Sequence, residues 1–347
     1  MSDNTDRIKT KSKGRKSKTS YFFLFPFSLF LFILMFSTAC SYPERRAVEL
    51  YVDAVELKEF DENEKAVEKL DSAVQLNERF SLAYSLLGEI YQRMQDYEKS
   101  AVAYEKATEL NPWSFGDFFN LGRVYQVVKK FAQAVKAYAR ACELDPDHLD
   151  AHVNAAKCYY EIRDYNEALI YGKRAEQIVP DAVEVRDVLR DIYGSQGDIY
   201  ESQKDYEQAI ASYKRALEID SNNPKIMISL AVCYLKTGRE STAKELLISV
   251  TKIAPDNNAA YQYLGYCYLR LDDVDNATES YSRAIEINDK DWQAYRGLGV
   301  AYMLRALKDE DDALKEKAIR QWRLSLDIKP DQPRRERLLK LIERYSK

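Results

Sequence analysis

The chain has 347 residues, of which 46% are hydrophobic and 31% charged, and its formal net charge is −4. Glycine and proline are scarce, with 11 and 9 residues, whereas tyrosine is abundant, with 26. Because glycine and proline disfavour helix interiors, this composition suits packed helices and argues against a β-sheet protein. Five cysteines do not form the even, regularly spaced set of a disulfide framework.

Positive charge is concentrated at the amino terminus. Residues 1–20 contain seven Lys or Arg side chains and two Asp, whereas residues 40–347 contain 45 basic and 54 acidic side chains, a net charge of −9. Proteins bind nucleic acid by neutralising its phosphates with Lys and Arg. We therefore expect no nucleic-acid partner for the chain beyond residue 39.

An uncharged segment, Tyr21–Ala39, follows the basic stretch. It contains seven Phe and ends in small residues directly before Cys40. A basic region, an apolar region and a small-residue site are the three parts of a secretory signal. The segment resembles a bacterial lipoprotein signal, with Ser37 where Leu is usual. The resemblance implies that residues 1–39 are removed and that Cys40 carries acyl chains such as palmitate.

Two other interpretations of this segment remain open. Its 19 uncharged residues nearly reach the length that spans a bilayer, so it could be an uncleaved anchor with its basic side inside; the third interpretation is a cytosolic protein. Both the lipoprotein signal and the uncleaved anchor make residues 40–46 a short tether and place the remaining chain outside the membrane. We expect a lipid-anchored protein of the bacterial cell envelope that faces the periplasm or the exterior.

The remaining chain repeats with a period of 34 residues. In the clearest copy, Ser81–Ser114, the small residues Gly88 and Ala107 let two helices approach closely, and Pro112 ends the second helix. This pattern of aromatic, small and proline positions resembles the tetratricopeptide repeat (TPR). The resemblance implies an all-α, right-handed superhelical solenoid of antiparallel helix pairs that binds peptides or proteins.

Eight copies of the pattern cover residues 47–332: 47–80, 81–114, 115–148, 149–182, 183–223, 224–257, 258–291 and 292–332. Two copies carry seven extra residues, Val183–Leu189 and a second set within Leu307–Glu316. Because seven residues are about two helical turns, we expect a single helix from about Asp181 to Gln203. Residues 333–347 form the expected capping helix, with Leu338, Leu339 and Ile342 facing inward.

A candidate groove follows from the same register. In the TPR family, the second, fifth, ninth and twelfth residues of each first helix line the concave surface, where ligands bind. A row of apolar residues on a wet surface indicates an interaction site. The predicted partner-binding residues are Ile228, Val232, Leu235, Tyr266, Leu269, Val300, Met303 and Arg296. The alternative is that the superhelix buries them against a neighbour or the cap.

A second, polar part of the groove is predicted in the third and fourth copies. Asn120, Arg123, Asn154 and Lys157 occupy equivalent positions there and could hold a carboxylate or backbone amides. The set resembles the carboxylate clamp of chaperone-binding TPR proteins, but the preceding copy lacks the clamp residues. Solvated surface charge is the alternative.

The sequence contains no motif that indicates a catalytic site. The two histidines, His148 and His152, lack the further ligands of a metal motif, and we interpret them as part of a solvated turn. Asp309–Asp312 is interpreted as a capped helix start. We expect four cysteines to be buried thiols: Cys142, Cys158, Cys233 and Cys267.

The sequence therefore predicts no catalytic residue, no metal and no cofactor. It favours a membrane-tethered scaffold that binds a peptide or helix of other envelope proteins through its concave surface. The alternative is a ligand-binding subunit that carries a small hydrophobic molecule for an envelope transport system.

Overall fold

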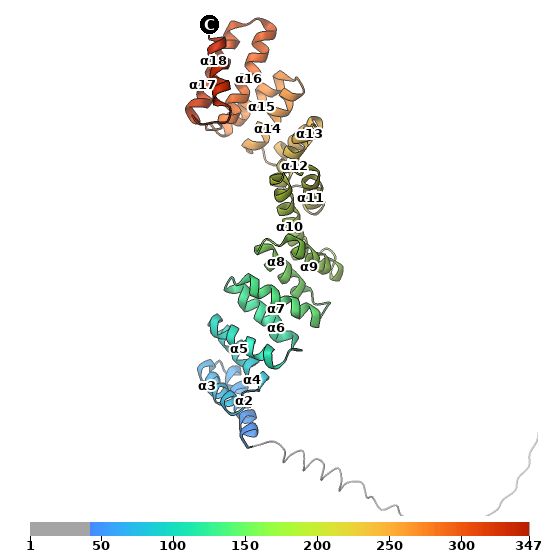
Figure 1. The fold of residues 1–347 in the computed structure, drawn as a ribbon, viewed down its shortest axis with the longest axis vertical. Helices are drawn as coiled ribbons and strands as arrows, with labels where there is room; N and C mark the ends of the chain where they lie inside the picture. The colour runs from blue at the N-terminus through green and yellow to red at the C-terminus, as the bar shows by residue number, and fades with distance from the viewer. Residues whose placement is uncertain (1–41, 347) are drawn as a thin grey trace, which may run out of the picture.

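The computed structural model describes residues 42–346, which form helices joined by short turns (Figure 1) and contain no strand. The first helices of the eight pairs are α2 (Tyr42–Glu59), α4 (Ser81–Arg93), α6 (Phe115–Val127), α8 (Leu149–Glu161), α10 (Val183–Ser202), α12 (Pro224–Lys236), α14 (Asn258–Arg270) and α16 (Trp292–Asp309). The second helices are α3 (Asn63–Leu76), α5 (Tyr97–Leu110), α7 (Phe131–Leu144), α9 (Tyr165–Ile178), α11 (Tyr206–Ile219), α13 (Glu240–Ile253), α15 (Val274–Ile287) and α17 (Asp312–Ile328). Helix α18 (Arg335–Tyr345) ends the row.

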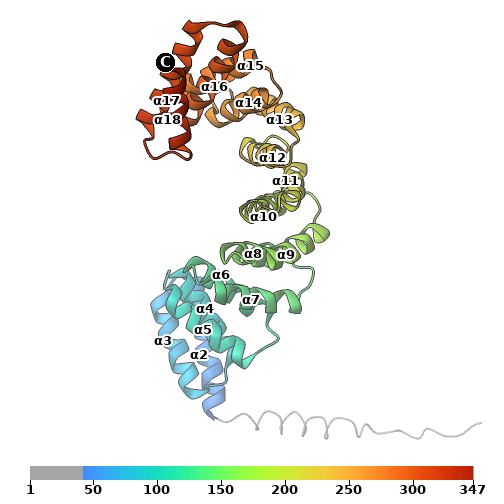
Figure 2. The same ribbon diagram turned by 45° about the horizontal axis from the view of Figure 1, so that its top comes forward.

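The pairs stack in chain order into an elongated, curved solenoid. Each helix packs against its partner in the pair and against the helix that follows, so the core is a series of small clusters along the whole molecule. Figure 2 shows α8, α10 and α12 on the inner side of the bend and their partners α9, α11 and α13 on the outer side. The all-α solenoid predicted from the period is thus confirmed.

Most pairs close through a large ring on the second helix that lies against a glycine on the first. A Cβ atom added to these glycines would lie between 2.4 and 2.9 Å from ring atoms, closer than real side-chain contacts allow. The glycine and ring partners are Gly88 with Tyr104, Gly122 with Tyr138, Gly197 with Tyr213, Gly265 with Tyr281, and Gly299 with Trp322. The absent side chain therefore sets how closely the two helices approach.

The α8–α9 pair has a different arrangement. Its second helix carries Gly172 at the position of the ring, and its first helix carries Ala156 in place of the glycine. The vacated space is filled from the next pair by Leu189, which is 2% exposed, and by Ile192, which is fully buried. Both residues belong to α10.

Helix α10 is one uninterrupted helix of 20 residues, which confirms the long helix predicted for this part of the chain. Its additional two turns bring Val185 and Leu189 into the core of the preceding pair. In the last pair the extra residues also extend helices, giving α16 18 residues and α17 17 residues. Asp311 caps α17 by accepting a hydrogen bond from the Leu314 N–H at 3.1 Å, as the interpretation of this acidic segment requires.

The first helix begins earlier than the sequence suggested. Helix α2 starts at Tyr42, so the prediction of a tether over residues 40–46 was wrong for residues 42–46. Proline needs no hydrogen-bonded N–H in the first helical turn, and Pro43 lies there as the second residue. The predicted signal, residues 1–39, and Cys40 lie outside the described residues. None of the helices in residues 42–346 is both long and apolar enough to span a membrane.

The capping helix α18 folds back onto the last pair. Leu338 and Ile342 are 5% and 8% exposed and pack with Trp322 of α17, while Leu339 is partly buried. The charged side of the helix faces water, so the last apolar surface of the solenoid is covered, as open-ended repeat arrays require.

Candidate partner-binding groove

A cavity of about 520 Å³ opens on the first helices of the sixth to eighth pairs. It contains six of the eight residues that the sequence predicted for the groove: Val232, Leu235, Tyr266, Leu269, Val300 and Arg296. These side chains come from α12, α14 and α16, which are consecutive first helices. Polar side chains complete the lining: Lys236, Gln262, Gln293 and Arg334. The groove is therefore lined by both apolar and polar side chains.

The apolar side chains reach the groove because of their register on each helix. Val232 lies between the buried residues Ala231 and Cys233, so it projects away from the core that its neighbours fill. Tyr266 is 44% exposed. On α16, Gly297 leaves room for the ring of Tyr281, whose Cζ would lie 2.3 Å from a Cβ atom at that position. The floor of the groove thus includes a tyrosine of a second helix.

Two predicted groove residues lie elsewhere. Met303 is 5% exposed and packs in the cluster of Trp322 and Leu338, so its placement on the concave surface was wrong. The cap folds over this end of α16, which the repeat register alone does not reveal. Ile228 is partly buried against the core of the α12–α13 pair and does not line the cavity.

Arg296 is the most constrained polar side chain of the groove. Its Nη1 donates a hydrogen bond to the Pro333 carbonyl oxygen at 3.1 Å, and its guanidinium carbon lies 4.9 Å from the centre of the Trp292 ring. Burial, and then the positive charge of Arg334, lowers the pKa of Arg296. An arginine remains charged under such conditions, so a desolvated positive charge faces the groove.

A second cavity, of about 300 Å³, adjoins the first and shares Arg296, Val300 and Arg334 with it. Its other lining residues are Trp322, Arg337, Leu338 and Leu341. Arg334 and Arg337 were not predicted from the sequence, because they lie outside the repeats in which groove positions recur. Three arginines within four residues, Arg334, Arg335 and Arg337, could have indicated a positively charged site here.

The polar part of the groove predicted in the third and fourth pairs lies on α6 and α8. Asn120 is partly buried and Arg123 is exposed, and the charge of Arg123 acts on the phenols of Tyr104 and Tyr138. Asn154 and Lys157, both partly buried, occupy α8. Whether the four residues hold a ligand stays a prediction.

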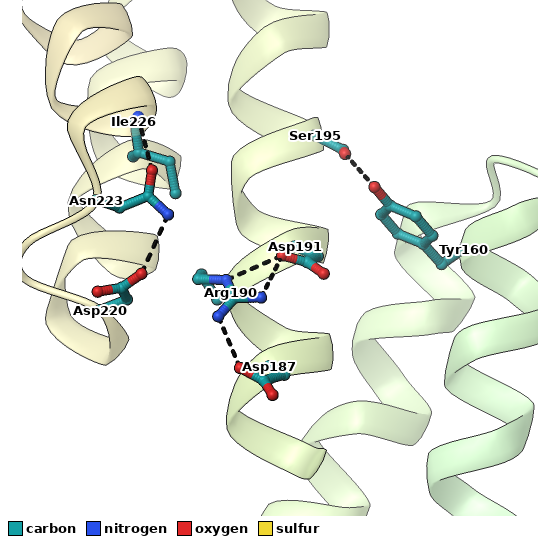
Figure 3. Close-up of polar contacts among 8 residues, drawn as sticks. All are labelled: Tyr160, Asp187, Arg190, Asp191, Ser195, Asp220, Asn223 and Ile226. Carbon is teal, nitrogen blue, oxygen red and sulfur yellow. Dashed lines mark hydrogen bonds and ion pairs between the residues drawn. The ribbon is translucent and has the colours of Figure 1, made fainter. Parts of the chain in front are cut away.

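The middle of the inner surface, between α8 and α12, contains a narrow polar cleft of about 120 Å³. Its groups pair with one another (Figure 3): Arg190 donates to Asp187 at 2.6 Å and to Asp191 at 2.9 Å, and the hydroxyls of Tyr160 and Ser195 are 3.1 Å apart. Side chains that already have partners offer little to a ligand. This cleft is therefore a weaker candidate than the groove.

The prediction of a solvated turn was wrong for His152, which is buried on α8, whereas His148 lies in the turn before this helix and is partly exposed. His148 caps α8 by accepting a hydrogen bond from the Ala151 N–H at 3.3 Å, and its ring packs against Phe115 and Phe119. His152 is 6% exposed, with its Nε2 3.0 Å from the Pro146 carbonyl oxygen. No group of three metal-ligating side chains occurs among residues 42–346.

The four thiols within the described residues are buried and free, as predicted. Burial raises the pKa of Cys142, Cys158, Cys233 and Cys267 to about 12. Such thiols are almost wholly protonated near neutral pH and are poor nucleophiles. They act as small core residues.

A third surface cavity, of about 650 Å³, was not predicted from the sequence. Its apolar side chains are Tyr84, Leu87 and Tyr91 of α4 together with Val102 of α5, which is 65% exposed. Charged side chains of both signs surround them, including Lys99 and Glu105. Nothing within residues 42–346 indicates what would cover this cavity.

Comparison with known proteins identifies the repeats. Models of families described as tetratricopeptide repeat match residues 81–114, 119–183, 201–265 and 259–291, which together are more than half of the chain.

Two curated relatives share part of the sequence. The general transcriptional corepressor trfA of Dictyostelium discoideum is 27% identical over 121 residues, 34% of this chain and 9% of that protein. Anaphase-promoting complex subunit 3 of Schizosaccharomyces pombe is 27% identical over 135 residues, 39% of this chain and 20% of that protein. The chain thus spans only a small part of either relative.

A solved structure of Naa15/Naa10 bound to HypK-THB has a similar fold. It aligns with 86% of this chain and 46% of its own, with a TM-score of 0.55 and 17% identity. At this identity the likeness concerns the fold alone.

Proposed function

Because the chain belongs to the tetratricopeptide repeat family, a family of protein-interaction scaffolds, we propose that it captures a partner segment in the groove of its carboxy-terminal half. The observation that carries the proposal is the cavity formed by three consecutive first helices. Apolar side chains such as Val232 and Tyr266 supply contact area, and flanking amide and basic side chains supply hydrogen bonds. Peptide-binding grooves combine these two elements.

We further propose that the scaffold is tethered to a membrane of the bacterial cell envelope through acylated Cys40. The support is the order of basic residues, apolar segment and small residues before this cysteine. Helix α2 begins at Tyr42, only two residues after Cys40. A chain of this length reaches less than about 10 Å, so the first pair would lie directly at the membrane and the groove several pairs away from it.

The groove favours a peptide over a small hydrophobic ligand. A carrier of a small apolar molecule needs an enclosed pocket with mainly apolar walls. Here Lys236, Gln262, Gln293 and two arginines line an open surface. Such polar groups match the backbone amides and side chains of a polypeptide.

The groove is tested with the variant Val232→Asp/Tyr266→Asp and a matched control, Ile170→Asp. Ile170 lies on the second helix α9 and is 60% exposed, so this change adds a surface charge away from the groove. Each full-length protein is produced in its source cell, cross-linked and purified, and its partners are identified by mass spectrometry. We expect a partner that is retained by the wild type and the control and is lost from the groove variant. Equal recovery with all three proteins would contradict the proposal.

The tether is tested by Cys40→Ala. We expect this variant to fold normally and to lose incorporation of radiolabelled palmitate. Retained labelling would exclude acylation at Cys40. A wild-type protein that takes up no label but stays in the membrane fraction would favour an uncleaved anchor.

A further inference from the structure

Three arginines converge where the two groove cavities meet. Arg296 and Arg334 line both cavities, and Arg337 lines the second. Within residues 42–346, none of these three side chains forms an ion pair with a carboxylate, although the neighbouring Arg335 pairs with Glu336 on the same helix at 2.8 Å. Like charges held close together without a counter-ion are unfavourable. The arrangement is therefore suited to an anion from outside the chain.

The arginine cluster is defined as Arg296 of α16 with Arg334 and Arg337 at the start of α18, and the loop before Arg334 is hydrogen-bonded to α17. Gln332 is 3% exposed, and its Nε2 donates to the Ser325 Oγ at 3.1 Å. The Ser325 hydroxyl donates in turn to the Trp292 carbonyl oxygen at 2.8 Å. This chain of contacts ties the loop between α17 and α18 to the start of α16. The backbone that leads into Arg334 is therefore held in place, and Arg296 is oriented by its hydrogen bond to the Pro333 carbonyl oxygen of the same loop.

The backbone of Arg334 lies in the left-handed region, with φ of 63° and ψ of 27°. This conformation is unfavourable for a residue other than glycine. The residue lies at the start of α18, where no side chain caps the free N–H groups. The loop thus presents both the arginine and the positive end of a helix dipole on this side of the groove.

Apolar surface continues on both sides of the arginine cluster. Leu235 and Tyr266 lie in the first cavity, whereas Leu338 and Leu341 lie in the second. If a bound segment fills both cavities, its middle residues, and not its terminal residue, lie beside the arginines. The anion would then be a side chain of the segment, flanked by apolar residues.

We propose that the arginine cluster binds the carboxylate of an Asp or Glu side chain within the captured segment, between apolar side chains that enter the two cavities. The proposal rests on the proposed groove function and specifies the chemistry of the partner. Arginine forms charge-assisted hydrogen bonds with carboxylates in paired geometry, and Arg296 is already oriented by Trp292 and the Pro333 carbonyl. The bound carboxylate would supply the missing counter-charge.

The experiment screens the purified full-length protein against immobilised 12-residue peptides of random sequence with blocked ends. Blocking removes terminal carboxylates, so that only side chains can supply the anion. We expect the bound peptides to be enriched in an internal Asp or Glu with apolar residues on both sides. Replacing that residue with Asn or Gln should weaken binding about tenfold or more, as for other charged hydrogen bonds.

Two variants with arginine-to-glutamine changes test whether the preference for acidic peptides comes from the cluster. Arg334→Gln/Arg337→Gln should weaken binding of the acidic peptides about tenfold or more. Because Arg296 remains in this variant, the amide substitution in the peptide should still weaken binding, but by a smaller factor than in the wild type. Arg335→Gln, on the same helix but paired with Glu336, should bind like the wild type. Unchanged circular dichroism spectra verify that both variants fold.

The outcomes separate the two proposals. Bound peptides without acidic enrichment, or an acidic preference that is undiminished in the double variant, would overturn the inference and leave the groove function intact. Binding that occurs only with free terminal carboxylates would also overturn it. Failure to bind any peptide would overturn both the inference and the proposed function.

Discussion

The Cδ2 atom of Leu189 lies 2.8 Å from the position that a Cβ atom would occupy on Gly172. Leu189 comes from α10, whereas Gly172 belongs to α9 of the preceding pair. Five other pairs fill this space with a tyrosine or tryptophan of their own second helix. The two residues therefore link neighbouring pairs through a shared core, and this link depends on the additional turns of α10.

This contact predicts strong coupling between substitutions at the two positions. Leu189→Ala removes a buried side chain and should lower the free energy of unfolding by about 2–5 kcal/mol. Gly172→Ala alone forces Leu189 to move and should cost about 1–3 kcal/mol. In the double variant the added methyl group occupies part of the vacated space, so the combined loss should be smaller than the sum. Urea-induced unfolding followed by circular dichroism measures all three variants; additive losses would contradict the shared core.

The approach of α16 and α17 depends on Gly299. A Cβ atom there would lie 2.4 Å from the Trp322 ring and 3.0 Å from the Ala318 carbonyl oxygen. Since the backbone of α17 cannot yield easily, Gly299→Ala should destabilise the protein by about 1–3 kcal/mol. Gly116→Ala is the matched control, because Gly116 has no neighbouring atom within 4 Å of the added Cβ. The control should be neutral or more stable by about 0.5–1 kcal/mol, and an equal loss in both variants would show that packing is not the cause.

Burial of His152 predicts a loss of stability in mild acid. Its pKa is lowered from 6.5, first by desolvation. Above pH 6.5 the imidazole is neutral in both states and has no effect. As the pH falls below 6.5, the unfolded chain takes up a proton before the folded one, so the free energy of unfolding decreases until the folded pKa is reached.

The variant His152→Gln tests this assignment, because its amide can still donate to the Pro146 carbonyl but does not titrate in this range. Urea unfolding of both proteins is measured from pH 7.5 to pH 5. We expect the wild type to lose more stability than the variant over this interval. Parallel curves would assign the acid sensitivity to other groups.

The thiols provide a test of how tightly the pairs pack. In the Cys40→Ala variant, Cys142, Cys158, Cys233 and Cys267 remain, each with a pKa near 12. At pH 8 we expect no reaction with a disulfide reagent in the folded protein and reaction of all four thiols in urea, since thiolates are the reactive form. Fast labelling of Cys233 or Cys267 without denaturant would mean that the groove helices open readily.

The period of the sequence was sufficient to predict the helix pairs and the single long helix α10, because the close helix contacts recur at fixed residues such as Gly88 and Gly265. The groove was predicted in large part for the same reason. Val232 and Tyr266 occupy register positions that face away from the buried neighbours on their own helices.

What the sequence could not predict depends on contacts outside the repeat register. Met303 satisfies the register, but α18 folds over it. Arg334 lies in a loop whose course is fixed by Gln332 and Ser325, a contact between residues that the period does not relate. His152 was wrongly placed in a turn: it lies on α8, where its ring is buried and packs near Tyr171 of α9.

The dependence of Gly172 on Leu189 limits how this array can change length in evolution. A pair such as α6–α7 contains its own glycine and ring, Gly122 and Tyr138, so its duplication or deletion would leave intact interfaces between the remaining pairs. The α8–α9 pair cannot be separated from α10 in this way, because its core would lose Leu189 and Ile192. The α8–α9 pair and α10 should therefore be duplicated or deleted only together, because they share one core.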